Sequence, residues 1–324
     1  MQIEHHHLKV FGDDVVNLSR EVASEKRKQV NTLRDRLEAH IAANPGFALV
    51  KMLHAGSVAK GTALRTVNDF DVAVYVWSEE LPGSASLVDW MAERLREAYA
   101  GLIDNEQIQP GTHCVTITFK SSGTVVDVVP VLYEGDPDDR GYLISRDTGD
   151  RLLTSVRLHL DFVRKRKAAV PTDFAQTVRF AKWWIRNQRI KHGDRFRFKS
   201  FMAELIVADL VDNGVIMSDY TAGVEAFFNQ IVKTELRDRI AFSDYYDLSE
   251  LPAAGADPIE IIDPVNPNNN AARLYTESDR RRIVDAAEDA LDAIAEAKYA
   301  TTKSRAVDCW QVVLGERFRG APRS

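Results

Sequence analysis

The sequence has few cysteines and no long apolar run. Its 324 residues include only Cys114 and Cys309, and two distant cysteines make neither a disulfide framework nor a four-ligand zinc site. No apolar stretch approaches the roughly 18 residues of a membrane span, and Met1–Glu4 does not begin a basic-then-apolar signal peptide. These absences predict a reduced, cytoplasmic protein, in which the alternating apolar pattern around Cys114 favours a buried thiol.

The formal net charge of −6 conceals a strongly basic stretch. Between residues 164 and 199, twelve lysine and arginine residues are opposed only by Asp173 and Asp194. Such an excess in an acidic protein favours a polyanionic ligand, while a solvated helix face is the simpler alternative. The basic residues are Arg164, Lys165, Arg166, Lys167, Arg179, Lys182, Arg186, Arg189, Lys191, Arg195, Arg197 and Lys199.

Hydrophobic periodicity divides the chain into an α/β part and a helical part. Around residue 150 the pattern changes from mixed helices and strands to predominantly helices. We therefore expect an N-terminal α/β lobe over residues 1–150 and a closely packed helical lobe over 151–324. The predicted strands are 47–53, 69–77, 113–120 and 124–132, and the last two form a hairpin through Ser121-Ser122-Gly123. Residues 56–64 are predicted to be a turn followed by a short helix, and the other predicted helices are 14–43, 87–100, 155–168, 173–190, 200–213, 221–232 and 278–298. The long helix 14–43 is expected to span both lobes.

Three aspartates interrupt the apolar strands. Asp69 and Asp71 are two residues apart, so their side chains share one face of the predicted strand. Asp127 stands alone in an apolar strand, where an isolated charge is costly unless it is paired or metal-bound. Such carboxylates suit Mg²⁺, and three of them can hold two metal ions about 4 Å apart. We expect one ion to bind a nucleotide triphosphate and the other, with Asp127 as proton acceptor, to activate an attacking hydroxyl.

A Gly-Ser turn precedes the aspartates. Gly56 has no side chain, so the backbone can approach a ligand closely. Ser57 can donate a hydrogen bond to phosphate, and the short helix that follows can direct its N-terminal amides at an anion. Alone, each feature is weak evidence, since an Asp-x-Asp pair is often a surface pair or a calcium ligand. The combined order of strand, Gly-Ser, short helix, Asp-x-Asp strand and later Asp in an apolar strand is much more specific.

This combination resembles the polymerase-beta-like nucleotidyltransferases, in particular the branch that contains oligoadenylate synthetase and cyclic GMP-AMP synthase. The resemblance implies that Lys182 and Ser200 contact the triphosphate and that Phe201 stacks on the donor base. The alternatives are a basic surface lysine, a helix-capping serine and a phenylalanine of the core. The segment Ile262-Asp263-Pro264-Val265-Asn266-Pro267 also resembles the oligoadenylate synthetase family, although a structural turn is the preferred interpretation.

Whole segments resemble the bacterial CD-NTases, and the HORMA-associated clade C and D enzymes most closely. These segments are residues 56–65, 68–75, 198–205 and 263–267. The resemblance implies a polymerase-beta-like lobe with a mixed sheet and a helical lobe that completes the nucleotide-binding cleft. It also implies anti-phage synthesis of cyclic oligoadenylate, cyclic triadenylate above all, from ATP with two Mg²⁺ or Mn²⁺ ions. Its implied partners are a HORMA-domain activator, an AAA+ regulator and double-stranded DNA, but this chain lacks the cysteine–histidine zinc insertion of the animal DNA sensor.

Two other functions use the same residues. A CCA-adding or poly(A)-polymerase-like enzyme, which modifies RNA or a protein, needs the same three aspartates, so these residues do not exclude it. No clear additional RNA-binding module follows residue 300, which favours the second-messenger synthase. A catalytically inactive binding module is disfavoured because all three carboxylates and the Gly-Ser turn are present.

Overall fold

The protein folds into two compact units. The computed structural model describes residues 2–43, 48–66, 69–77 and 86–320, with only the backbone of Lys26, Ala48, Asp69 and Ser86. One unit, the sheet unit, is Leu18–Asp161, and the other, the helical unit, combines Met1–Asn17 with Phe162–Ser324. The predicted boundary near residue 150 thus lies about a dozen residues early, and the first 17 residues belong with the helical unit.

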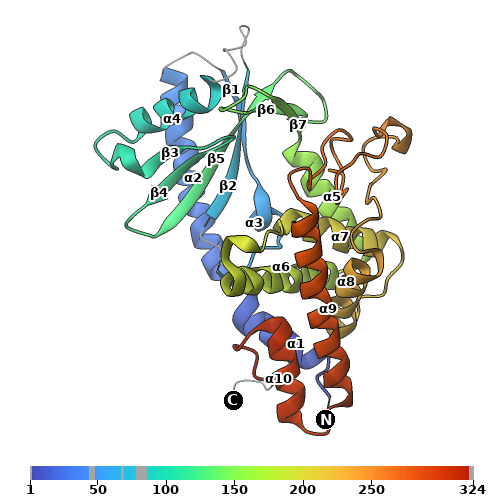
Figure 1. Ribbon diagram of the computed structural model, residues 1–324. Coiled ribbons are helices and arrows are strands. Elements are labelled where there is room, and N and C mark those ends of the chain that lie inside the picture. Colours follow the sequence, from blue (N-terminus) through green and yellow to red (C-terminus); the bar gives the residue numbers. More distant parts are fainter. Residues whose placement is uncertain (1, 44–47, 67–68, 78–85, 321–324) are drawn as a thin grey trace. The chain divides into compact units, whose positions relative to one another are not determined.

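The sheet unit contains a mixed sheet and helices on one of its faces (Figure 1). The strand order is β1-β2-β5-β4-β3, with β6 paired to β5 and β7 to β6. Only β2 and β5 run parallel among these pairs. The strands are β1 (Ala48–His54), β2 (Asp69–Trp77), β3 (Ile108–Pro110), β4 (Val115–Phe119), β5 (Thr124–Tyr133), β6 (Gly141–Ile144) and β7 (Arg151–Thr154), and the helices are α2 (Arg20–Ala43), α3 (Gly56–Lys60), α4 (Ser86–Ala98) and the 3₁₀ turn η2 (Asn105–Gln107).

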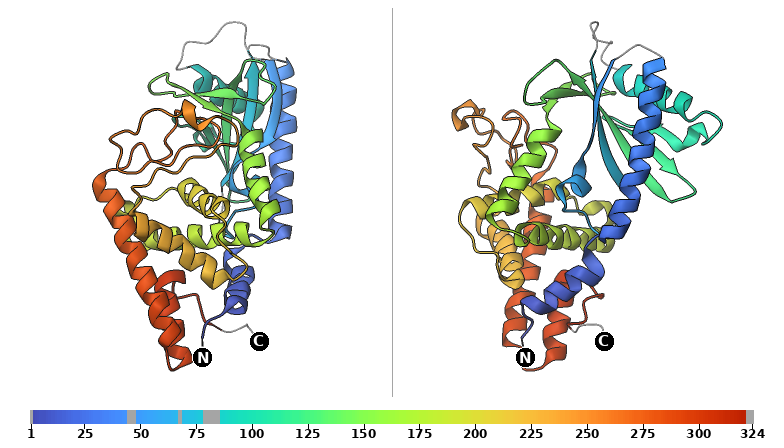
Figure 2. Two further views of the ribbon diagram at one scale, coloured as in Figure 1. Left: turned by 90° about the vertical axis from the view of Figure 1, so that its right-hand side faces the viewer. Right: turned by 180° about the vertical axis from the view of Figure 1, so that it is seen from behind.

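Side-chain alternation gives the two faces of the central strands different roles. On β2, Phe70, Val72, Val74 and Val76 enter the main core, which α2 and α4 cover (Figure 2). The intervening Ala73 and Tyr75 join Val131 of β5 in a smaller cluster on the opposite face. By the same alternation, Asp71 and Asp127 belong to this opposite face, away from α2 and α4.

The predicted single helix over residues 14–43 is interrupted, and that prediction is wrong. A π-helical turn, η1 (Gly12–Val16), ends at Asn17, whose backbone is extended at φ −78° and ψ 135°. The Ser19 side chain and carbonyl then accept hydrogen bonds from the amides of Val22 and Ala23, so α2 begins with a new cap. Asparagine and serine favour such ends because their side chains compete for backbone hydrogen bonds.

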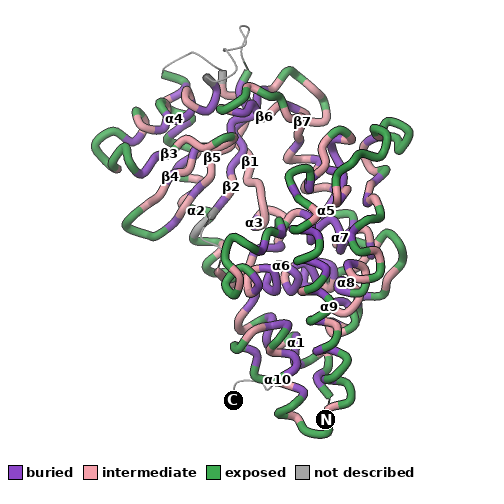
Figure 3. The backbone as a smooth tube through the Cα atoms, in the orientation of Figure 1, coloured by how far each residue is buried: buried purple, intermediate pink, exposed green. Residues whose placement is uncertain are grey.

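The helical unit is built around α6 (Figures 1 and 3). Trp183 and Trp184 of α6 are fully buried, and the Trp183 indole donates to the carbonyl of Leu314 at 2.7 Å. No described helix of the protein is both long and apolar enough to cross a membrane. The helices of this unit are α1 (His5–Phe11), the main part of α5 (Val156–Ala169), α6 (Asp173–His192), α7 (Ser200–Asp212), α8 (Tyr220–Thr234), α9 (Glu277–Tyr299) and α10 (Lys303–Leu314), with 3₁₀ turns η3 (Gly193–Arg195) and η4 (Leu248–Glu250).

The Asp-Pro-Val-Asn-Pro segment is a turn, as preferred from the sequence. Asp263 is buried, and its carboxylate accepts from the Val265 amide at 2.8 Å and from the Asn269 side chain at 3.1 Å. The Asn266 side chain accepts from the amide of Asn268 at 3.1 Å. These side chains satisfy backbone groups that an irregular buried segment would otherwise leave unpaired.

Candidate active site

Parallel pairing brings two of the predicted aspartates together. The Cα of Asp71 on β2 is paired with that of Asp127 on β5, so the two side chains are same-face neighbours. Both residues are only partly buried. Adjacent carboxylates repel each other, and a cation between them removes that penalty. Their chemistry and placement therefore fit an oxygen-ligated divalent ion.

Gly56 lies directly against Asp71. A Cβ at this position would come within 1.6 Å of Asp71 Oδ2, and the backbone φ of Gly56 is +63°. Any side chain there would clash with the carboxylate and strain the backbone. The amide of Ala55 also donates to the carbonyl of Asp71 at 2.9 Å. The Gly-Ser turn is thus packed against the carboxylate pair, with Ser57 in the first turn of α3.

Two polar side chains from the β4 segment complete the described carboxylate surface. Thr116 is paired with Asp127 across β4 and β5, and its hydroxyl donates to Asp127 Oδ1 at 2.6 Å. The pKa of the Cys114 thiol is raised first by burial and then by the negative charges of Asp127 and Asp71. Cys114 is half-buried and precedes the strand, so the predicted buried thiol is not observed.

Asp69, the third predicted carboxylate, begins β2. Its Cα pairs with Val125, two residues before the Asp71 and Asp127 pair. Its side chain lies outside the described part of the structure, as does the whole of Asn68. Among the side chains that are described, no group of three or more histidines, cysteines, aspartates and glutamates is arranged to hold a metal ion. The described part of the site is therefore a pair of carboxylates.

Lys182, predicted to contact a triphosphate, is buried in the helical unit. It projects from α6, is 7% exposed, and lies 3.5 Å from Glu204 Oε2 on α7. Glu204 is 1% exposed. Burying two charges is costly unless they are paired, so this ion pair explains how Lys182 remains in the interior. The alternative of a solvated surface lysine is wrong.

Ser200 and Phe201 open α7. The N-cap position belongs to Lys199 rather than Ser200, and no side chain caps this end of the helix among the described residues. The interpretation of Ser200 as a helix cap is therefore wrong, and the residue is exposed. Phe201 is half-buried, which places it outside the fully buried core.

The basic stretch 164–199 is not one solvated face. Arg166 is buried and forms ion pairs with Asp212 and Asp244, while Lys182 is paired with Glu204. Near the start of α7, a hollow of about 450 Å³ has Arg189, Arg197 and Lys199 among its lining residues. Burial lowers the pKa of Lys199, and the positive charges of Arg197 and Arg273 lower it further. The positive charge of these side chains makes this hollow suitable for an anionic ligand.

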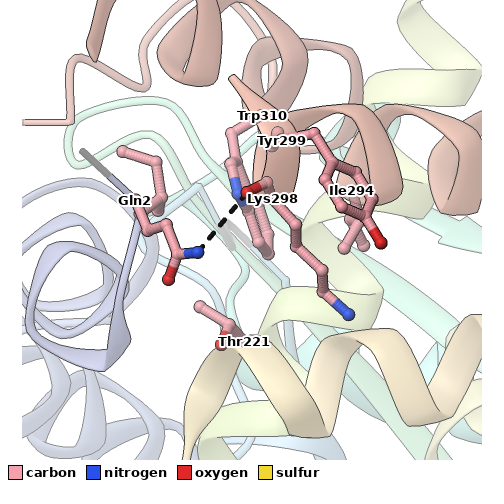
Figure 4. A pocket seen from close by; sticks show the side chains of 8 residues that line it. Gln2, Thr221, Ile294, Lys298, Tyr299 and Trp310 are labelled. Atoms are coloured by element: carbon pink, nitrogen blue, oxygen red, sulfur yellow. Dashed lines mark hydrogen bonds between the residues drawn. The ribbon is translucent and has the colours of Figure 1, made fainter. Parts of the chain in front are cut away.

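A second hollow, of about 350 Å³, lies where the N-terminal segment meets α9 and α10 (Figure 4). Gln2 donates to the carbonyl of Lys298 at 3.4 Å, and the Lys298 amine pairs with Glu225. None of the predicted site residues lines it. It is therefore no candidate for the catalytic centre.

Sequence analysis missed Thr116 and Glu204. The predicted hairpin came within one residue of pairing Thr116 with Asp127, because a three-residue turn at 121–123 sets residue 116 opposite 128. In the structure four residues, 120–123, separate the paired strand ends, and this register sets Thr116 opposite Asp127. For Glu204, the available signal was a single carboxylate inside the apolar run 201–208. A charge in such a run needs a partner, and the structure supplies Lys182.

Comparisons with known proteins find relatives over nearly the whole chain. A cyclic AMP-AMP-AMP synthase of Escherichia coli (strain MS 115-1) is 48% identical over 319 residues, which cover 98% of each chain. A CBASS oligonucleotide cyclase, CdnC, of Escherichia coli (strain KTE188) is 28% identical, again over 98% of each chain. A scan against protein-family models found no match.

Solved structures are also similar to this protein over nearly its whole length. CdnC of Escherichia coli MS115-1 in a complex with HORMA-deltaN superposes with a TM-score of 0.89 at 47% identity, over 98% of this chain and 99% of that one. The structure of the same CdnC with ATP also gives 0.89, at 48% identity and the same coverage. The Vibrio cholerae cyclic AMP-GMP synthase DncV, with a TM-score of 0.72 at 13% identity over 98% of each chain, shares the fold.

Proposed function

The chain belongs to the bacterial CD-NTase family of nucleotidyltransferases, and from this premise we propose that it makes cyclic AMP-AMP-AMP from ATP in anti-phage signalling. The observation that carries the proposal is the register that sets Asp71 beside Asp127, with Gly56 against them. The 48% identity with a cyclic AMP-AMP-AMP synthase supports the product. The same identity favours a second-messenger synthase over a CCA-adding or poly(A)-polymerase-like enzyme.

The proposed reaction repeats one phosphoryl transfer until the ring closes. A ribose hydroxyl of one nucleotide attacks the α-phosphorus of the next, a phosphodiester forms, and the bond to pyrophosphate breaks. The hydroxyl proton passes to Asp127, which stands on the strand next to Asp71. Gly56 and Ser57 hold the triphosphate close to the backbone, since the turn has no side chain at Gly56.

Asp69, Asp71 and Asp127 are the residues proposed to hold divalent cations. Two Mg²⁺ ions, or Mn²⁺ in their place, would neutralise phosphate charge and acidify the attacking hydroxyl. The neighbouring half-exposed carboxylates of Asp71 and Asp127 fit hard cations that retain water ligands. The third ligand, Asp69, is proposed from its place two residues before Asp71 on the same strand.

Three residues of the helical unit are proposed to bind ATP. Lys182 supplies positive charge to the triphosphate, Ser200 a hydroxyl, and Phe201 an aromatic face for the adenine. Ser200 is exposed at the start of α7 and Phe201 is half-buried, which leaves both able to touch a ligand. The adjoining basic hollow around Lys199 supports an anion near this end of the helix.

The proposed partners come from the relatives. The complex of CdnC with HORMA-deltaN supports a HORMA-domain activator for this chain. An AAA+ regulator and binding of double-stranded DNA rest on the resemblance alone. Arg166 and Lys182 are buried and ion-paired, so two of the twelve basic residues are not available to contact DNA.

The proposal is tested by incubating the protein and its HORMA-domain partner with labelled ATP, Mg²⁺ and then phosphatase. We expect a phosphatase-resistant product that migrates as cyclic triadenylate. Asp69→Ala combined with Asp71→Ala should abolish it, and Asp127→Asn should lower the rate by roughly 10³-fold, as expected for loss of the group that accepts the proton.

The matched control removes two negative charges elsewhere. Asp285 and Asp289 are exposed on α9, and Asp285→Ala with Asp289→Ala should leave product formation unchanged. Unfolding temperatures of all variants separate loss of chemistry from loss of fold. Full activity of the Asp69→Ala, Asp71→Ala double variant would refute the site, and elongation only with added RNA would refute the cyclase.

A further inference from the structure

Asp127 has a neighbour on each side. Because β5 lies between β2 and β4, Asp127 has Asp71 on one flank and Thr116 on the other. The Thr116 hydroxyl donates to Asp127 Oδ1 at 2.6 Å, a length typical of a hydrogen bond from a hydroxyl to a charged carboxylate. Within the part of the chain that the structure describes, this is the one hydrogen bond recorded for the Asp127 side chain.

We propose that Thr116 is a positioning residue that holds the Asp127 carboxylate for metal binding and proton transfer. This inference rests on the proposed function. The Thr116 hydroxyl holds Oδ1 on the side of β4, so that Oδ2 remains for a cation. Without that bond, repulsion from Asp71 and free rotation of the side chain would let Asp127 leave this orientation. Groups that orient a metal ligand typically contribute 10–100-fold to metal affinity or activity.

The competing explanation is that threonine is present only because β-branched residues suit strands. Thr118 separates the two explanations within the same strand. It shares the face of Thr116, two residues further along β4, and is paired with Val125 instead of an aspartate. Replacement of either threonine by valine keeps the β-branched shape and removes only the hydroxyl. A strand-propensity role predicts equal effects at both positions, and a positioning role predicts an effect at Thr116 alone.

The experiment compares Thr116→Val, Thr116→Ser and Thr118→Val with the wild-type protein. Binding of Mn²⁺ is followed by the electron paramagnetic resonance of the free ion, in the presence of a non-reactive ATP analogue and without turnover. Thr116→Val should raise the Mn²⁺ concentration for half-saturation by about 10-fold or more. Thr116→Ser retains the hydroxyl and should bind nearly as the wild type does, and Thr118→Val should be unchanged.

Steady-state kinetics of the complex with the HORMA-domain partner supply a second measurement. Thr116→Val should lower kcat more than it raises KM for ATP, because the lost interaction acts on the metal and the reacting groups. Equal effects of Thr116→Val and Thr118→Val would overturn the proposal. So would wild-type Mn²⁺ affinity in Thr116→Val, or a wild-type protein that binds no Mn²⁺.

The Mn²⁺ measurement also keeps this proposal separate from the proposed function. A wild-type protein that binds Mn²⁺ but forms no cyclic product would refute the cyclase. The Mn²⁺ affinities of Thr116→Val and Thr118→Val would still test the role of Thr116. Conversely, normal product formation with an unchanged Thr116→Val variant would refute Thr116 alone. A crystal structure of Thr116→Val should show the Asp127 carboxylate in an altered or divided orientation.

Discussion

Two charged pairs, one in each unit of the protein, are arranged on opposite principles. Asp71 and Asp127 carry the same charge, are neighbours on parallel strands, and are partly open to solvent. Lys182 and Glu204 carry opposite charges, lie 3.5 Å apart between two helices, and are almost fully buried. The first pair is an electrostatic liability for folding, whereas the second is satisfied within the fold.

The difference teaches that a charge within an apolar segment does not by itself identify a binding group, and that the charge of its neighbour must also be known. A like-charged pair on adjacent strands has no structural benefit, so its presence argues for a ligand of opposite charge. In the buried pair, the attraction between Lys182 and Glu204 offsets the cost of removing both charges from water. Such a pair can occur in a protein of any function. The role of Lys182 in nucleotide binding therefore needs a separate test of stability and activity.

The largest stability effect is expected from Glu204→Met. Removing one member of a buried ion pair leaves the other charge uncompensated and destabilises a protein by about 3–5 kcal/mol. Urea denaturation should show this loss. Asp127→Asn removes repulsion in the other pair, so its free energy of unfolding should be equal to or above that of the wild type.

The combined variant Lys182→Met, Glu204→Met is the control for this pair. Apolar side chains of similar size often replace a buried ion pair without loss of stability, so the double variant should recover most of the unfolding free energy. It should nevertheless form little product, because Lys182 is proposed to contact the triphosphate. A stable and fully active double variant would show that Lys182 is structural only, and an unchanged Glu204→Met variant would show that the pair is unimportant.

An intermediate effect is expected at Gly56, which lies against the like-charged pair. In Gly56→Ala the new Cβ would overlap Asp71 Oδ2, and a φ of +63° disfavours any side chain. We expect a loss of about 1–3 kcal/mol from overpacking and about a 10²-fold loss of rate from displacement of the carboxylate. Urea denaturation and the labelled-ATP assay measure the two effects.

Gly123 is the matched control for Gly56. Its φ is +65°, and a Cβ there would meet nothing within 4 Å. Gly123→Ala should therefore show only the backbone penalty, about 1–2 kcal/mol, with normal product formation. If both alanine variants lost the same stability and rate, close contact with Asp71 would not be the reason for glycine at position 56.

The strands that carry Asp71 and Asp127 could be predicted from the sequence, but the pairing of these two strands could not. Period-2 alternation located β2 at residues 69–77, and the β4–β5 hairpin followed from Ser121-Ser122-Gly123. The parallel register of Asp71 with Asp127 depends on α4, β3 and β4, which all lie between the two strands in the chain. A pattern within one strand contains no information about that long-range register.

The helical unit shows the same limit more strongly. The helices α5 to α9 were predicted within about two residues at each end because apolar residues recur with helical spacing. The pairing of Lys182 with Glu204 joins different helices, so a local count of charges did not reveal that Lys182 is buried and paired. The break at Asn17 was missed because apolar spacing continues through it, while capping by Ser19 decides where α2 begins.

The smallest expected effect lies in the helical unit, on a helix that carries neither charged pair. Asp219 is the N-cap of α8 and accepts from the amides of Thr221 at 2.8 Å and Ala222 at 3.0 Å. Asp219→Ala should cost about 1 kcal/mol of unfolding free energy and leave product formation unchanged. The activity of Asp219→Ala shows whether a loss of stability alone lowers product formation. This reference is needed to interpret the activity of the less stable Glu204→Met variant.

Asp219→Asn sharpens this calibration, because asparagine caps helices as well as aspartate does but does not titrate. Burial by itself would raise the pKa of Asp219, yet the hydrogen bonds from the Thr221 side chain and from the Ala222 and Thr221 amides outweigh burial and lower it. A lowered folded-state pKa stabilises the protein above the ordinary aspartate value of 3.8, and this contribution disappears as the pH falls through the lower folded value. The stability difference between wild type and Asp219→Asn should therefore be constant near neutral pH and shift toward the variant below that range. A difference that stayed constant throughout acid titration would mean that the charge of Asp219 contributes nothing to the cap.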